Sequence, residues 1–175
     1  MAATGIRSPL GEPGAVPELA AIESRIVAER GSVSLLYRAL LNSGPVASGW
    51  ERMLTAIRNQ TAIPADLREL IILRIAVLNK AAFEFETHAP IAVKAGVAAN
   101  KIAAIRDVEL GADFTPLERA VLAATDALTC DVNLPDRLFA PLEAHFDAKR
   151  LVELIATIAA YNMVSRFLVA FRLEP

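Results

Sequence analysis

The chain has 175 residues, enough for one domain with a full hydrophobic core, and its net charge at neutral pH is −2. A weakly acidic chain without a run of basic residues argues against a nucleic-acid partner and against binding to an anionic membrane surface. The one cysteine, Cys130, excludes a disulfide within the chain and a CxxC redox pair, and it agrees with a cytoplasmic location.

The apolar content is high for a chain of this size. Hydrophobic residues make up 54% of it and aromatic residues only 6%, with a mean hydropathy of +0.40. A small domain has difficulty hiding so much aliphatic surface, so we expect a homo-oligomer whose interface covers the excess.

Helical periodicity dominates the chain, and we predict an all-α fold. Residues 1–16, rich in Ala, Gly and Pro, are expected to form a flexible N-terminal arm, and residues 17–175 a single helical domain. No segment of useful length alternates as a strand does. The predicted helices cover residues 17–31, 32–41, 46–60, 65–79, 81–95, 100–108, 115–130, 133–143 and 148–172.

Local signals mark several of these helices. Thr115, a proline and Glu118 form a capping sequence at one start, and Gly96 is a natural residue for the end of another helix. Pro90 lies inside the predicted helix at 81–95 and could kink or split it. Polar residues interrupt the apolar run at 151–171, which favours a buried helix over a membrane span.

The leading candidate for chemistry is a set of three residues: Glu69, Glu84 and His88. Glu84 and His88 are four positions apart and share one face of a helix, so the carboxylate could orient the imidazole. Glu69 lies on the preceding helix and could meet the pair if the two helices pack antiparallel. Imidazole is the usual proton-transfer group at neutral pH. The alternative is a solvated surface pair without a catalytic role.

Four further residues are candidates for substrate binding. Arg74 falls within an apolar stripe, where it either binds a substrate carboxylate or forms a structural ion pair with Glu69 or another acid. Tyr161 and Asn162 lie in the apolar last helix and need partners, in a pocket or across a subunit interface. Trp50 shares one helical face with Leu54 and Ile57.

Metal and cofactor chemistry find little support in the sequence. Two carboxylates and one imidazole could hold iron or manganese, but no second histidine accompanies them, so we predict no metal. No phosphate loop, nucleophile elbow or dinucleotide fingerprint is present, and we predict no cofactor. Cys130 lies beside Asp131, which does not favour a thiolate.

At these residues the chain resembles the carboxymuconolactone decarboxylase family, which includes the alkylhydroperoxidase D-type proteins. The similarity runs from about Trp50 to Arg106, through the segments RELIILRIAVL and FEFETHAPIAVKAGV, and resumes near the end of the chain. It implies an alkylhydroperoxidase D-like helical bundle that assembles as trimers or hexamers, with a dimer also possible. The peroxidase branch carries a CxxC pair where this chain has Ala81 and Glu84.

The resemblance is therefore to the branch without CxxC. It implies a cofactor-free lyase that acts on an unsaturated carboxylic acid or lactone. His88 would donate the proton, Glu84 would orient it, Arg74 would anchor a carboxylate and Glu69 would complete the network. Two alternatives remain open at this point: a redox protein that acts on peroxide through Cys130, and a non-catalytic homologue.

Overall fold

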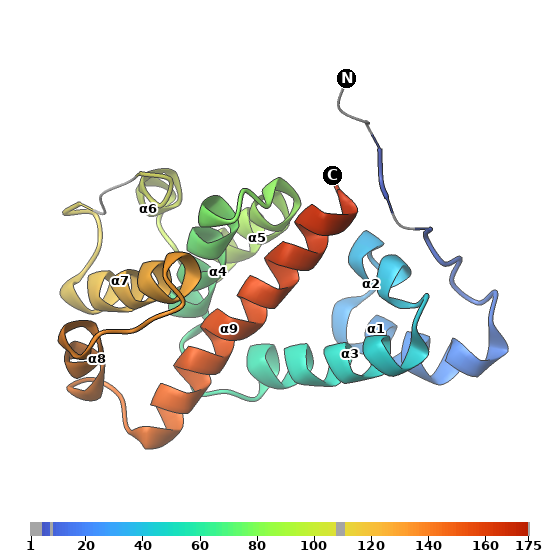
Figure 1. Cartoon of the computed structure of the whole chain (residues 1–175), viewed down its shortest axis with the longest axis horizontal. Coiled ribbons are helices and arrows are strands. Elements are labelled where there is room, and N and C mark those ends of the chain that lie inside the picture. Colours follow the sequence, from blue (N-terminus) through green and yellow to red (C-terminus); the bar gives the residue numbers. More distant parts are fainter. Residues whose placement is uncertain (1–4, 8, 108–110, 175) are drawn as a thin grey trace. The chain divides into compact units, whose positions relative to one another are not determined.

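The computed structural model describes residues 5–7, 9–107 and 111–174, and it confirms an all-helical fold, with no strand among these residues. Figure 1 shows the helices in chain order. Their bounds are η1 Pro17–Leu19, α1 Ala20–Arg30, α2 Leu35–Leu40, α3 Gly44–Asn59, α4 Ala65–Leu78, α5 Ala82–Lys94, α6 Ala99–Ala104, α7 Pro116–Cys130, α8 Asp136–Glu143 and α9 Ala148–Phe171.

Most predicted helices agree with the structure to within a few residues, and the exceptions have local causes. Gly44 and Pro45 open α3 instead of separating two helices, because proline fits the first turn of a helix. Helix α5 continues through Pro90. Helix α6 ends at Ala104, and the predicted end at Val108 lies outside the described residues.

The chain divides into two compact units. One comprises residues 1–61 and 170–174, and the other comprises residues 62–169 with residue 175. In the first unit α1 and α2 both contact α3. Part of the predicted arm is bonded there: the Gly11 amide donates to the Arg38 carbonyl at 2.9 Å, and the Asn42 side chain donates to the Pro9 carbonyl at 2.7 Å. Residues 1–4 and 8 of the arm lie outside the described residues, and its flexibility and the single domain stay predictions.

Helix α4 is the centre of the second unit. Nine of its residues are buried, on all sides of the helix, so it packs as a core helix rather than as an amphipathic surface helix. It contacts α5 and α7. A short turn reverses the chain between α4 and α5: Lys80 takes a positive φ of 56°, and the Ala81 amide donates to the Ala76 carbonyl at 2.8 Å. Helices α4 and α5 therefore form an antiparallel hairpin.

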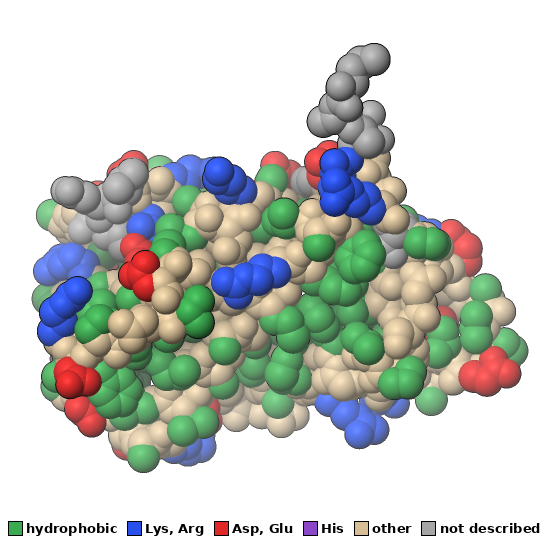
Figure 2. Space-filling view, in the orientation of Figure 1, with side chains coloured by type: hydrophobic (Ala, Val, Ile, Leu, Met, Phe, Trp, Pro, Cys, Tyr) green, Lys and Arg blue, Asp and Glu red, His purple; other side chains and the backbone are tan. Residues whose placement is uncertain are grey.

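Helices α7 and α9 also belong to this part of the fold. Helix α7 begins with the predicted capping box, in which Thr115 and Glu118 bond each other's backbone amides. Helix α9 is long and apolar enough to cross a membrane by length and composition, but half of its most apolar stretch is buried, as in the core helix of a folded domain. Apolar side chains are also spread over the face seen in Figure 2, and Val152 on α9 is 70% exposed.

Candidate functional site

The α4–α5 hairpin brings Glu69 and His88 together. Because the two helices run antiparallel, side chains 19 positions apart face each other, and Nδ1 of His88 lies 2.7 Å from Oε2 of Glu69. Glu69 is fully buried and His88 is 6% exposed. The predicted meeting of these two residues is confirmed. Arg68 Nε lies 3.6 Å from the other oxygen of Glu69, at ion-pair distance.

This contact fixes the chemistry of the imidazole. A carboxylate can only accept, so the proton of a neutral ring lies on Nδ1, and the lone pair of Nε2 is the one that takes up a second proton. The Glu69 carboxylate then stabilises the positive charge that the ring acquires. The ring of Tyr161 on α9 packs perpendicular to the imidazole at a centroid distance of 5.5 Å. The arrangement is that of an oriented acid–base group.

Glu84 is held differently from what the helical spacing predicts. The spacing suggests that Glu84 orients His88, but Glu69 bonds Nδ1, and the carboxyl group of Glu84 bonds the Ser165 hydroxyl of α9. Glu84 is 1% exposed, and its Oε1 atom has no hydrogen-bond partner among the described residues. Burial raises the pKa of Glu84 to about 8, against a smaller lowering by the Ser165 bond.

Ser165 is the residue that the sequence analysis missed as part of the site. It is fully buried and lies 81 positions from Glu84. Its one signal is a polar residue within the apolar stretch of the last helix. The pairing itself depends on how α9 packs against α5, which residue spacing does not reveal.

Arg74 forms a structural ion pair, which is one of the two roles predicted for it from the sequence. Its Nε and Nη2 atoms donate to the two carboxylate oxygens of Asp126 on α7 at 2.7 and 2.6 Å. Its Nη1 atom donates to the carbonyls of Ile105 and Asp107 at 2.9 and 2.6 Å. These bonds tie α4 to α7 and to the end of α6, so we leave Arg74 out of the site.

Of the other candidate binding residues, Tyr161 joins the cluster. Asn162 is buried and bonds Asn79 at 3.0 Å and Thr129 at 2.9 Å, which makes it a link between helices. Trp50 lies on α3 in the other unit. Cys130 is exposed at the end of α7. Within the described ranges no group of three potential ligands could hold a metal ion.

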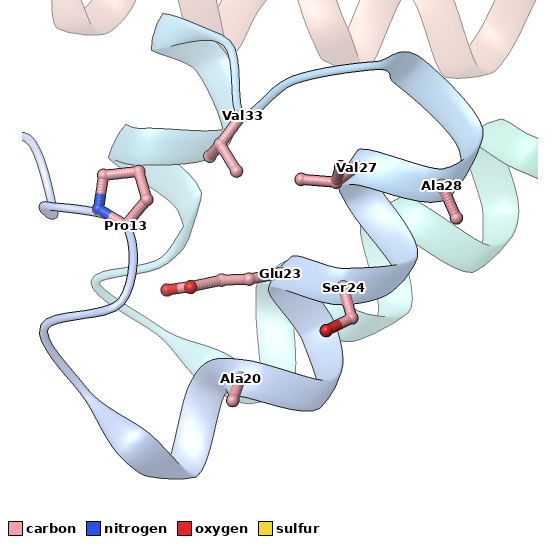
Figure 3. A pocket seen from close by; sticks show the side chains of 7 residues that line it. All are labelled: Pro13, Ala20, Glu23, Ser24, Val27, Ala28 and Val33. Carbon is pink, nitrogen blue, oxygen red and sulfur yellow. The ribbon is translucent and has the colours of Figure 1, made fainter.

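A pocket in the N-terminal unit offers less chemistry. It measures about 490 Å³ and lies between α1 and the segment that carries Pro13 (Figure 3). Its one carboxylate, Glu23, points towards that segment and accepts the Gly14 amide at 2.8 Å. The remaining lining is small or apolar apart from Ser24. We therefore place the candidate site at Glu69 and His88.

Comparison with known proteins identifies a family pattern in the middle of the chain. The sequence pattern of the carboxymuconolactone decarboxylase family matches residues 45–127, which include Glu69, Glu84 and His88. The uncharacterised protein YdfG of Bacillus subtilis is 27% identical over 113 residues, which span 63% of this chain and 77% of YdfG.

Two solved structures share the fold. A peroxidase-related protein from Ralstonia eutropha with an alkylhydroperoxidase AhpD core superposes with a TM-score of 0.83 at 18% identity, over 99% of this chain and 94% of that one. The debrominase Bmp8, crystallised with 2,3,4-tribromopyrrole, superposes with a TM-score of 0.80 at 19% identity, over 98% and 91%. These two structures support an AhpD-like fold and leave the reaction open.

Proposed function

Since this chain belongs to the carboxymuconolactone decarboxylase family, we propose that it is an enzyme in which His88, held by Glu69, transfers a proton to or from a small organic substrate. The observation that carries the proposal is the buried contact of 2.7 Å between the imidazole and a carboxylate. A carboxylate held out of solvent against Nδ1 is how many enzymes orient a histidine for proton transfer.

Within this class we propose a cofactor-free lyase that acts on an unsaturated carboxylic acid or lactone. When the substrate carboxylate leaves as carbon dioxide, its electron pair moves through the double bond, and a more distant carbon takes the proton from Nε2 of His88. The ring then regains a proton from solvent. A peroxidase reaction with a pair of thiols is not supported, because the chain has one cysteine and it lies outside the cluster.

The test is a time course of 4-carboxymuconolactone loss, followed by ultraviolet absorbance without added metal or thiol. We expect turnover in the wild type and a loss of about 10²–10⁴-fold in His88→Ala, the range typical of a general acid or base. Cys130→Ser is the matched control, because this residue is exposed and should leave turnover unchanged. Full turnover in His88→Ala would refute the assignment, and no turnover in any variant would redirect the search to other unsaturated or keto acids.

We also propose that the chain assembles as a homo-oligomer and is located in the cytoplasm. Large aliphatic side chains remain exposed in both units, among them Val46 at 49%, Val93 at 59% and Val152 at 70%. Covering such side chains is favourable in water. Light scattering on the purified protein would test self-association, and a mass equal to one chain at micromolar concentration would refute it.

A further inference from the structure

The hydroxyl of Ser165 lies at hydrogen-bond distance from two oxygen atoms but carries only one proton. Its oxygen lies at hydrogen-bond distance from Oε2 of Glu84 and 3.0 Å from the carbonyl of Tyr161, one turn earlier on α9. A serine hydroxyl carries one proton, and both neighbours would be acceptors if Glu84 were ionised. One of the two bonds would then lack a hydrogen.

A proton on Glu84 removes this conflict. Oε2–H of Glu84 donates to Oγ of Ser165, and the Ser165 hydroxyl donates to the Tyr161 carbonyl, the usual back-bond of a serine within a helix. Glu84 Oε2, the Ser165 hydroxyl and the Tyr161 carbonyl then each have a role that their chemistry allows. Burial acts in the same direction, because Glu84 is 1% exposed and its pKa lies near 8.

The charges around Glu84 are consistent with a neutral group. The charged and titratable groups of the cluster are Glu69 and Arg68 on α4, His88 on α5 and Tyr161 on α9, and Arg68 lies at ion-pair distance from Glu69. No cation among the described residues bonds the carboxyl group of Glu84, whose one partner in this part of the chain is Ser165. Burial alone opposes an ionised Glu84, because a charge held out of water with no cation bonded to it is costly.

We propose that Glu84 is a neutral carboxylic acid held by Ser165, and that this neutrality lets the site admit an anionic substrate beside the Glu69–His88 pair. The inference rests on the proposed function for its substrate class. An anion that approaches His88 then meets one carboxylate, Glu69, whose charge is offset by Arg68 at 3.6 Å and by the imidazole when it is protonated. Glu84 is in this view a positioning residue that sets the charge of the site, and proton transfer remains with His88.

The proton itself can be measured without a substrate. In a carbon-13 titration of glutamate side-chain carboxyls we expect one resonance with a midpoint near pH 8, absent in Glu84→Gln and retained in Glu86→Gln. Glu86 is the matched control, because it is exposed on the same helix. Ser165→Ala should shift the midpoint, because the Ser165 hydroxyl is the group that bonds the Glu84 carboxyl in either protonation state. If every glutamate titrates in the ordinary range, or if Ser165→Ala leaves the midpoint unchanged, the inference fails.

The charge argument has its own readout in the kinetics. For 4-carboxymuconolactone we expect KM to rise several-fold above pH 8 in the wild type and in Glu86→Gln, and to stay level in Glu84→Gln, while kcat changes less. A KM that is level across this range in the wild type would overturn the argument. Absence of lactone turnover would refute the proposed function, and the carbon-13 titration would still decide the state of Glu84.

Discussion

Replacing Glu84 by Gln should make the protein more stable relative to wild type as the pH rises. In the wild type the pKa of Glu84 is raised from 4.5 to about 8 by burial. Between these values the unfolded chain has lost the proton and the folded chain has kept it, so the free energy of unfolding falls with increasing pH. Glutamine has nearly the same shape, remains neutral and removes this dependence.

The size of the effect follows from the same two pKa values. A separation of about 3.5 pH units corresponds to about 5 kcal/mol, at about 1.4 kcal/mol per unit. Because part of the change lies below pH 5, the difference in unfolding free energy between Glu84→Gln and wild type should shift by about 4 kcal/mol between pH 5 and pH 9. The sign of that shift favours the variant at high pH.

Urea denaturation followed by circular dichroism at pH 5, 6, 7, 8 and 9 measures this difference directly. Glu86→Gln is again the control, because an exposed glutamate contributes little to the pH dependence. Parallel pH profiles for wild type and Glu84→Gln would refute the reasoning, since they would mean that Glu84 loses its proton at the same pH in the folded and unfolded chain.

Four further changes test other parts of the structure. Arg74→Met should cost about 1–3 kcal/mol of unfolding free energy in urea, because it leaves the half-buried Asp126 carboxylate and the Ile105 carbonyl without their donor; a cost below about 0.5 kcal/mol would contradict the structural role. Asn162→Ala should lower the free energy of unfolding by about 1–3 kcal/mol, because it leaves the polar partners of Asn162 unsatisfied. Wild-type stability in urea denaturation would refute this linking role. Thr115→Ala should lower the free energy of unfolding by about 1 kcal/mol, because the Thr115 side chain no longer accepts the Glu118 amide in the capping box. An unchanged urea midpoint would argue against a stabilising role of this hydrogen bond. Cys130→Ser should leave stability within about 0.5 kcal/mol and any peroxide consumption unchanged; a loss of peroxide consumption would revive thiol chemistry.

The sequence predicts the helices well because their signals are local. The apolar pattern of α4 and the capping residues of α7 are set by neighbours within a turn or two. The contact between Glu69 and His88 could also be predicted, because a short connection between two helices leads to antiparallel packing.

The partners of Glu84 and Arg74 could not be predicted in this way. Ser165 lies 81 positions from Glu84, and Asp126 lies 52 positions from Arg74, each on a helix whose packing angle no local signal gives. The helical spacing of Glu84 and His88 pointed to a bond between them. The structure shows other partners for both groups. The Ser165 hydroxyl of α9 bonds one oxygen of the Glu84 carboxyl group, and Nδ1 of His88 is bonded to Glu69.

Because the turn between α4 and α5 is short, the contact between Glu69 and His88 depends on the number of residues between them as much as on which residues these are. Glu69 and His88 are 19 positions apart, and only residues 79–81 between them lie outside a helix. One residue inserted within α5 before His88 would rotate the imidazole by about 100° around the helix axis, away from its carboxylate. We therefore expect insertions and deletions to be excluded from residues 69–88, even where single substitutions are tolerated. For the same reason, this hairpin is the segment to transplant when the acid–base pair is to be built into another helical scaffold.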